Sequence, residues 1–179
     1  MEGPAAPRWA WWVATGFGSG RIRPAPGTWG SLAALAAWCL PARAALAAPP
    51  WAGELLFLAL PLLMTWVAVE ASDRVVLETG TKDPGWIVAD EWAGLWIALW
   101  AVRWEAARAL AGPWDLRLAV LLGVPFLLFR LFDIGKPWPV RQIQVLPGGA
   151  GIVADDVVAG LYALPLAQLL VPMGLRMLA

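Results

Sequence analysis

The chain has 179 residues, of which 60% are hydrophobic and 15% are charged, and its formal net charge is zero. Soluble domains are about 45–50% apolar and about 25% charged, so this composition predicts a membrane protein and gives no sign of a nucleic-acid partner. The sequence has no histidine and one cysteine, Cys39, which excludes histidine-based phosphate chemistry, His-ligated zinc and an intramolecular disulfide. Any phosphate chemistry must therefore use carboxylates, Lys, Arg and backbone amides.

The first part of the chain is predicted to hold an interfacial segment, a loop and an apolar helix. Residues 1–14 combine tryptophans with a short apolar piece, which favours an anchor at the membrane surface. Thr15–Ser31 is rich in glycine and proline, so it is predicted to be a loop. A helix is expected over Leu32–Leu40, with Thr28 or Ser31 available as its N-cap, and the next proline ends or kinks it.

The middle of the chain is predicted to hold two further helices. Glu54–Glu70 encloses a long uncharged run that is suited to crossing a membrane, and the helix is expected to continue through Ala71–Thr79. Gly80–Gly85 is predicted to be a turn. Ile87–Val102 is expected to be an apolar helix, and Arg103–Asp115 is a polar segment that Gly and Pro interrupt.

The last part predicts two more helices. Leu116–Phe132 is one, stopped by the two prolines that follow it, and Gln142–Gly151 is predicted to be a loop. The final helix is expected to start near Asp155, and its uncharged run, Val157–Leu175, is about 28 Å long as a helix, roughly one bilayer core. With about five long helices, the predicted fold is an all-α, multi-helix membrane bundle with several short, kinked or re-entrant helices, in a single domain over residues 1–179.

Two acidic pairs occur in similar surroundings. Ile-Val-Ala-Asp-Glu ends at Asp90 and Glu91, and Ile-Val-Ala-Asp-Asp ends at Asp155 and Asp156. Acids at a helix start can simply complement the helix dipole. Unpaired carboxylates are costly in apolar sequence, however, and the glycines after each pair would let two helices approach closely. Side by side, these helices would bring four carboxylates together, which predicts a divalent cation such as Mg²⁺.

A third group of charges lies at the end of the predicted helix Leu116–Phe132. Arg130, Asp133 and Lys136 follow one another at three-residue intervals and would share one helix face. This spacing fits an ion pair at a helix end, and it equally fits a phosphate-binding strip beside a metal. A membrane transporter or ion-binding bundle would also explain buried carboxylates, but it explains the two adjacent cations less well. A catalytically silent lipid-binding scaffold is a further alternative.

Three blocks of sequence together resemble the phosphatidylglycerophosphatase A family. They are Gly16–Gly20 with Pro26–Leu32, then Ile87–Glu91, and finally Phe129–Pro139 followed by Gly148–Asp156, and the similarity extends over about Gly16–Ala163. The resemblance implies a multi-pass enzyme of the bacterial inner (cytoplasmic) membrane with its active site on the cytoplasmic side. It also implies Mg²⁺-dependent hydrolysis of the phospholipid phosphatidylglycerophosphate to phosphatidylglycerol and inorganic phosphate.

The resemblance also carries over site residues. The acidic positions, which would act in catalysis and hold Mg²⁺, fall on Asp90, Glu91, Asp133, Asp155 and Asp156. The positions that would bind the substrate phosphate fall on Arg130, Lys136, Gly27 and Thr28. Direct attack by a metal-activated water is expected, with Glu91 or Asp156 as general base. Gly135 and Ala89 stand where the family commonly has bulkier residues, which predicts altered packing and not lost activity.

Overall fold

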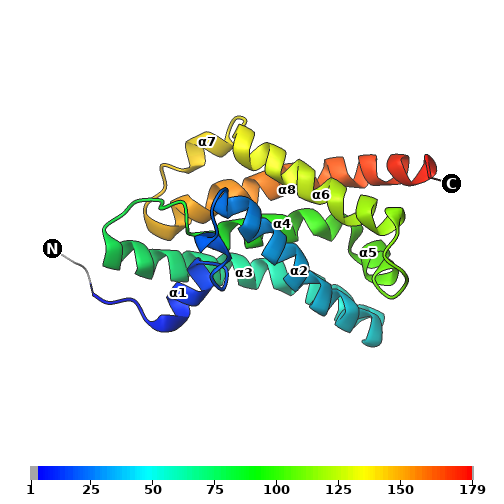
Figure 1. The fold of residues 1–179 in the computed structure, drawn as a ribbon, viewed down its shortest axis with the longest axis horizontal. Coiled ribbons are helices and arrows are strands. Elements are labelled where there is room, and N and C mark those ends of the chain that lie inside the picture. The colour runs from blue at the N-terminus through cyan, green and yellow to red at the C-terminus, as the bar shows by residue number, and fades with distance from the viewer. Residues whose placement is uncertain (1–3, 179) are drawn as a thin grey trace.

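The structure is a computed structural model that describes residues 4–178. Within these residues the chain forms eight α-helices and two short 3₁₀-helices, and no strand is present (Figure 1). The predicted all-α class is therefore confirmed. The elements, in chain order, are α1 Arg8–Ala14, η1 Ser19–Arg21, α2 Pro26–Ala47, α3 Pro50–Thr79, α4 Ala89–Leu99, η2 Trp100–Val102, α5 Arg103–Ala109, α6 Leu116–Gly135, α7 Val140–Ile143 and α8 Gly148–Arg176.

Four helices, α2, α3, α6 and α8, are long and apolar enough to cross a membrane. In the apolar 18-residue stretch of each helix, only 22% to 33% is buried inside the protein. The outer faces of these helices are therefore apolar and exposed. Apolar surface of this extent belongs in lipid, where each helix satisfies its own backbone hydrogen bonds. The protein is thus a membrane protein with four candidate spans, and it has one long helix fewer than the five that the sequence predicted.

The region that was expected to form the missing long helix is broken into short pieces. Where the sequence predicted one helix over Ile87–Val102, α4 stops at Leu99 and continues as η2 and then α5. These pieces run beside the long helices from near the middle of the molecule to the end where α6 begins (Figure 1). The inner face of α4 is buried in the main core, where Leu95 and Leu99 pack with Phe129 of α6. This segment therefore crosses the bundle on the inside.

The predicted start of α2 was wrong. The helix begins at Pro26 with Ala25 as N-cap, so Thr28 and Ser31 lie inside the helix and do not cap it. Proline suits the first turn of a helix, because its fixed φ is helical and its missing N–H would be unpaired there anyway. The helix also continues through Pro41, as α3, α6 and α8 continue through their own prolines, which helices in a lipid-embedded bundle tolerate.

The predicted start of α8 was also wrong. The helix begins at Gly148, inside the expected loop Gln142–Gly151, and Asp155 is its eighth residue. The glycines at this end pack on α3: a Cβ at Gly149 would meet the carbonyl oxygen of Val69. Asp73 of α3 accepts a hydrogen bond from the N–H of Gly149 at 2.6 Å. This tertiary contact compensates for the poor helix propensity of glycine, which made the segment look like a loop.

The N-terminal segment packs against the end of α3. Ala10 and Ala14 of α1 are fully buried with Ala71 and Val75 of α3. The predicted interfacial segment covers residues 1–14, and its first three residues lie outside the described part. In the described part, Trp9 and Trp12 are exposed, and the interfacial role of the segment stays a prediction.

Candidate active site

The candidate site lies where α4, α6 and α8 meet the first turns of α2. Asp90 and Glu91 are in the first turn of α4, and Arg130 is near the end of α6. Asp155 and Asp156 are in α8, well inside the helix. The three helices therefore bring the predicted acidic residues to one region of the bundle.

Two glycines determine how closely α4 and α8 pack. A Cβ at Gly94 would meet the carbonyl oxygen of Asp156, and a Cβ at Gly160 would meet the carbonyl oxygen of Gly94. Small residues at such a crossing allow two helix backbones to touch. The crossing lies directly beside Asp156, so this close packing brings the Asp156 carboxylate up to the start of α4.

Three carboxylates form a compact acidic triad: Asp90, Glu91 and Asp156. Each offers one oxygen, and these oxygens all lie within 4.8 Å of one another. Glu91 and Asp156 are buried, with 8% and 3% of their surface exposed. One buried oxygen of each residue has no hydrogen-bond partner among residues 4–178: Asp90 Oδ1, Glu91 Oε2 and Asp156 Oδ2.

The acidic triad fits a hard divalent cation. Three buried like charges repel one another and lose their hydration, so without a counter-charge they are strongly unfavourable. Carboxylate oxygens are the ligands that Mg²⁺ and Ca²⁺ prefer. The unpartnered oxygens and the all-oxygen donor set therefore indicate that a metal ion could bind between α4 and α8.

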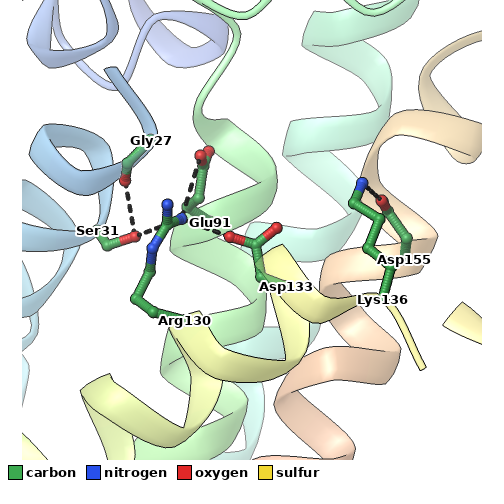
Figure 2. Close-up of polar contacts among 7 residues, drawn as sticks. All are labelled: Gly27, Ser31, Glu91, Arg130, Asp133, Lys136 and Asp155. Carbon is green, nitrogen blue, oxygen red and sulfur yellow. Dashed lines mark hydrogen bonds and ion pairs between the residues drawn. The ribbon is translucent and has the colours of Figure 1, made fainter. Parts of the chain in front are cut away.

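Arg130 connects the triad to α2 and α6. Its Nη1 forms an ion pair with Asp133 Oδ2, lies 3.7 Å from Glu91 Oε1 and donates to Ser31 Oγ at 3.4 Å (Figure 2). The Ser31 hydroxyl donates in turn to the carbonyl oxygen of Gly27 at 2.8 Å. The guanidinium is thus held by three elements, and only 15% of its side chain is exposed.

The backbone of Gly27 forms one side of the site, because glycine has no side chain to keep it away from the charged groups. A Cβ at this position would meet Glu91 Oε1 and would lie 3.2 Å from both terminal nitrogens of Arg130. The backbone of the first turn of α2 therefore approaches the charged groups closely. Thr28 is the next residue and is partly buried, but its hydroxyl makes no hydrogen bond to the acidic residues within residues 4–178.

The spacing had suggested that Lys136 shares a helix face with Arg130 and Asp133, but the structure does not place it there. It is the C-cap of α6 in a left-handed conformation, and its Nζ reaches across to Asp155 Oδ2 at 2.6 Å. Burial lowers the pKa of Lys136, but the hydrogen bond and the charge of Asp155 outweigh it, so the pKa lies above the ordinary lysine value. Lys136 is therefore a cation at neutral pH.

Asp155 has a second partner that sequence reasoning missed. Gln144 Nε2, from the segment before α8, donates to the same Asp155 Oδ2 at 2.7 Å. Figure 2 shows the Lys136–Asp155 pair at one side of the site and Arg130 at the other, with Asp133 between them. Ser31 was missed as well, because α2 was expected to begin after it. In a helix that begins at Pro26, Ser31 is four residues after Gly27, and this spacing would have indicated their contact.

A family profile and several relatives match most of this chain. The profile of the family described as "PgpA: Phosphatidylglycerophosphatase A" matches residues 12–171. Phosphatidylglycerophosphatase A of Haemophilus influenzae is 37% identical over 152 residues, covering 84% of this chain and 82% of that protein. The Escherichia coli protein of the same name is 35% identical over 157 residues, covering 84% and 77%.

A third relative carries a different name. A Bacteroides thetaiotaomicron protein named "Putative phosphatidylinositol-3-phosphatase" is 38% identical over 160 residues, covering 84% of this chain and 86% of that protein. No solved structure matches the chain. Because the profile and the relatives cover most of the sequence, the chain belongs to the phosphatidylglycerophosphatase A family of membrane enzymes that hydrolyse phosphate monoesters.

Proposed function

We propose that the protein hydrolyses phosphatidylglycerophosphate to phosphatidylglycerol and inorganic phosphate, in a reaction that depends on Mg²⁺. The observation that carries the proposal is the acidic triad, Asp90, Glu91 and Asp156, in a member of this family. Arg130 lies beside Glu91, and Lys136 pairs with Asp155, the neighbour of Asp156. A phosphate monoester carries two negative charges near neutral pH. It needs positive charge on several sides, and a metal flanked by Arg and Lys provides this.

Asp90, Glu91 and Asp156 are the residues that would hold Mg²⁺. When bound, the ion supplies Lewis-acid polarisation of the phosphoryl group and lowers the pKa of water. Asp133 and Asp155 lie next to the triad, and in this structure each pairs with one of the two cations. Their role is then to orient Arg130 and Lys136 toward the phosphate, although Asp155 Oδ1 is also unpartnered and could contribute to the metal site.

Arg130 and Lys136 would neutralise the phosphoryl oxygens. The planar guanidinium of Arg130 can bind two oxygens at once, and Lys136 acts as a point charge. The backbone N–H groups in the first turn of α2, at Gly27 and Thr28, add the partial positive charge of a helix N-terminus. Glu91 or Asp156 would accept the proton of the attacking water through the carboxylate oxygen that does not hold the metal.

The distribution of basic residues supports a site that faces the cytoplasm of the bacterial inner membrane. Five of the thirteen basic residues lie at the end formed by α5, the start of α6 and the end of α8: Arg43, Arg103, Arg108, Arg117 and Arg176. The other eight lie nearer the site: Arg8, Arg21, Arg23, Arg74, Lys82, Arg130, Lys136 and Arg141. Basic residues concentrate on the cytoplasmic side of inner-membrane proteins.

The direct test is phosphate release by the purified protein in detergent. The substrates compared are phosphatidylglycerophosphate and phosphatidylinositol 3-phosphate, each with Mg²⁺ and with excess chelator. We expect Mg²⁺-dependent release that is fastest with phosphatidylglycerophosphate. A preference for the inositol lipid would overturn the proposed substrate, and release that persists in chelator would overturn the proposed metal.

A further inference from the structure

A second cavity lies beside the candidate site and has no assigned ligand. Its volume is about 600 Å³, and its lining includes Trp11, Gly20, Arg21, Arg23, Pro26 and Trp86. It is formed by α1, the glycine-rich segment that contains η1, the start of α2 and the segment before α4. No residue of the acidic triad lines it. A cavity of this size can hold a small polar group with part of a lipid.

One wall of this cavity is aromatic and firmly held. The rings of Trp11 and Trp86 stack with centroids 5.2 Å apart and planes 18° from parallel. Trp11 Nε1 donates to Glu78 of α3 at 2.7 Å, which fixes the ring in place. A Cβ at Gly20 would meet the carbonyl oxygen of Trp86, so the glycine-rich segment and the segment before α4 are in direct contact. The wall is therefore formed before any ligand arrives.

The lining of the cavity also includes two arginine side chains. Arg21 and Arg23 are exposed, and neither forms an ion pair within residues 4–178. The Arg21 guanidinium lies 6.0 Å from the centre of the Trp11 ring, which orients it against the aromatic wall. Two unpaired guanidinium groups beside an apolar wall are suited to bind a phosphodiester. Arg binds phosphate oxygens bidentately, and the aromatic wall can pack against the carbon groups on either side of the phosphate.

Pro26 connects this cavity to the candidate active site. It lines the cavity, and the next residue, Gly27, lies against Glu91 and Arg130. A ligand whose terminal phosphate contacts Arg130 can therefore place a group a few atoms away in the cavity. Phosphatidylglycerophosphate has such a group, because a glycerol links its terminal monoester to a phosphodiester.

We propose that Arg21, Arg23 and the Trp11–Trp86 wall bind the phosphodiester of the lipid substrate and so distinguish it from lipids that carry only a terminal phosphate. This inference rests on the proposed function for its substrate. The same diester chemistry is present in neighbouring anionic phospholipids, so the test must separate the substrate's own diester from that of a bound lipid.

The kinetic test compares two substrates in mixed micelles. Phosphatidylglycerophosphate has both a monoester and a diester, whereas phosphatidate has the monoester alone. For the double variant Arg21→Gln/Arg23→Gln we expect KM for phosphatidylglycerophosphate to rise about tenfold, because two charge-assisted contacts are lost, with kcat within about twofold of wild type. The kinetic constants for phosphatidate should not change.

Arg141→Gln is the matched control, since Arg141 is an exposed cation at the same end of the molecule and does not line the cavity. It should leave both substrates unaffected. Two results would show that the arginines attract lipid only as surface charge. One is a rise in KM of the double variant that is equal for both substrates, and the other is the same rise in KM in the Arg141→Gln control. An unchanged KM for phosphatidylglycerophosphate would overturn the proposal outright.

A binding test separates this inference from the proposed function. Short-chain phosphatidylglycerol has the diester but no monoester, and its affinity for the protein can be measured by calorimetry in a zwitterionic detergent. We expect the double variant to bind it about tenfold more weakly than wild type and Arg141→Gln to bind it normally. We also expect it to compete with phosphatidylglycerophosphate in the assay.

Simultaneous binding of both lipids would assign the cavity to a neighbouring lipid and contradict the proposal. If wild type binds the short-chain lipid through these arginines but releases no phosphate from phosphatidylglycerophosphate, the proposed function fails while the diester site stands. Size-exclusion chromatography of each variant controls for folding.

Discussion

Asp155 and Asp156 are neighbours in sequence but have different partners. Adjacent residues on a helix point about 100° apart, so one faces the triad while the other faces Lys136 and Gln144. The same divergence does not separate Asp90 from Glu91, because both reach the triad from the first turn of α4. The first pair therefore contributes two carboxylates to the triad and the second pair contributes one. The sequence spacing, which is the same in both pairs, does not show this difference.

The Lys136–Asp155 pair should contribute to stability as well as to phosphate binding. Only 4% of the Asp155 side chain is exposed, so removing its cation leaves a buried charge with only Gln144 as a partner. Lys136→Ala should lower the free energy of unfolding by about 1–3 kcal/mol, a value reduced because Lys136 itself is partly exposed. Thermal unfolding in detergent measures this change.

Adding Asp155→Asn to the Lys136→Ala variant should recover part of the loss, because a neutral amide needs no counter-ion. Lys82→Ala, which removes an exposed lysine at the same end of the molecule, is the control and should change little. Equal stability of Lys136→Ala and wild type would show that this pair contributes nothing to folding.

At the level of the elements, the closeness of α4 and α8 is what forms the site. Gly160→Ala would place a methyl group against the backbone of Gly94 and force the two helices apart. We expect a loss of about 1–3 kcal/mol in stability and a fall in activity, because the triad residues lie on the two separated helices. Unfolding curves and phosphate release measure the two effects.

Gly123→Ala is the matched control, because Gly123 is also inside a helix but has open space where a Cβ would be. Alanine favours helix over glycine, so this variant should be at least as stable as wild type. If Gly160→Ala behaves like Gly123→Ala, close contact between α4 and α8 is not needed.

The docking of α8 on α3 is a second requirement. Asp73 accepts the N–H of Gly149 and so acts as a cap from another helix for the first turn of α8. Asp73→Ala should cost about 1–2 kcal/mol in the free energy of unfolding, as the loss of an N-cap does. Glu70→Ala, which removes an exposed partner of Arg74 one turn earlier, should cost less than about 0.5 kcal/mol. Equal costs would show that Asp73 is only a surface acid.

The sequence predicted elements best where apolar length decides the structure. The uncharged run that precedes Glu70 and the apolar run at Leu116 each form a long helix, as expected. The predicted helix starts were wrong at Gly148 and at Pro26. At Gly148, contact with α3 stabilises a helix in a glycine-rich segment. The sequence predicted the acidic and basic residues that the structure brings together, and their roles stay a prediction. Gln144 and Ser31 join them through tertiary contacts that no sequence pattern indicates.

On the scale of the whole molecule, the two ends of the bundle differ. The site, where α4 begins and α6 ends, lies in the half of the molecule away from α5 and the C-terminus (Figure 1). A membrane-impermeant thiol reagent tests the orientation in a Cys39→Ser background, since Cys39 is the one cysteine of the sequence. In intact spheroplasts, we expect labelling of a Trp114→Cys variant, because Trp114 is 85% exposed at the end away from the site.

A Lys82→Cys variant, at the site end, should be labelled only after the membrane is opened. Catalytic activity of both variants confirms that they are folded. The reverse pattern of labelling would place the active site on the outer face and contradict the proposed cytoplasmic location.

The central claim is that Asp90, Glu91 and Asp156 form a divalent-cation site, and calorimetric titration of the purified protein with Mg²⁺ tests it most directly. Wild type should bind Mg²⁺. Asp156→Asn and Asp90→Asn should remain folded, bind at least about tenfold more weakly and release almost no phosphate. Asp115→Asn, which alters an exposed N-cap of α6 away from the site, should match wild type. Unchanged Mg²⁺ affinity and full activity in both triad variants would contradict the account.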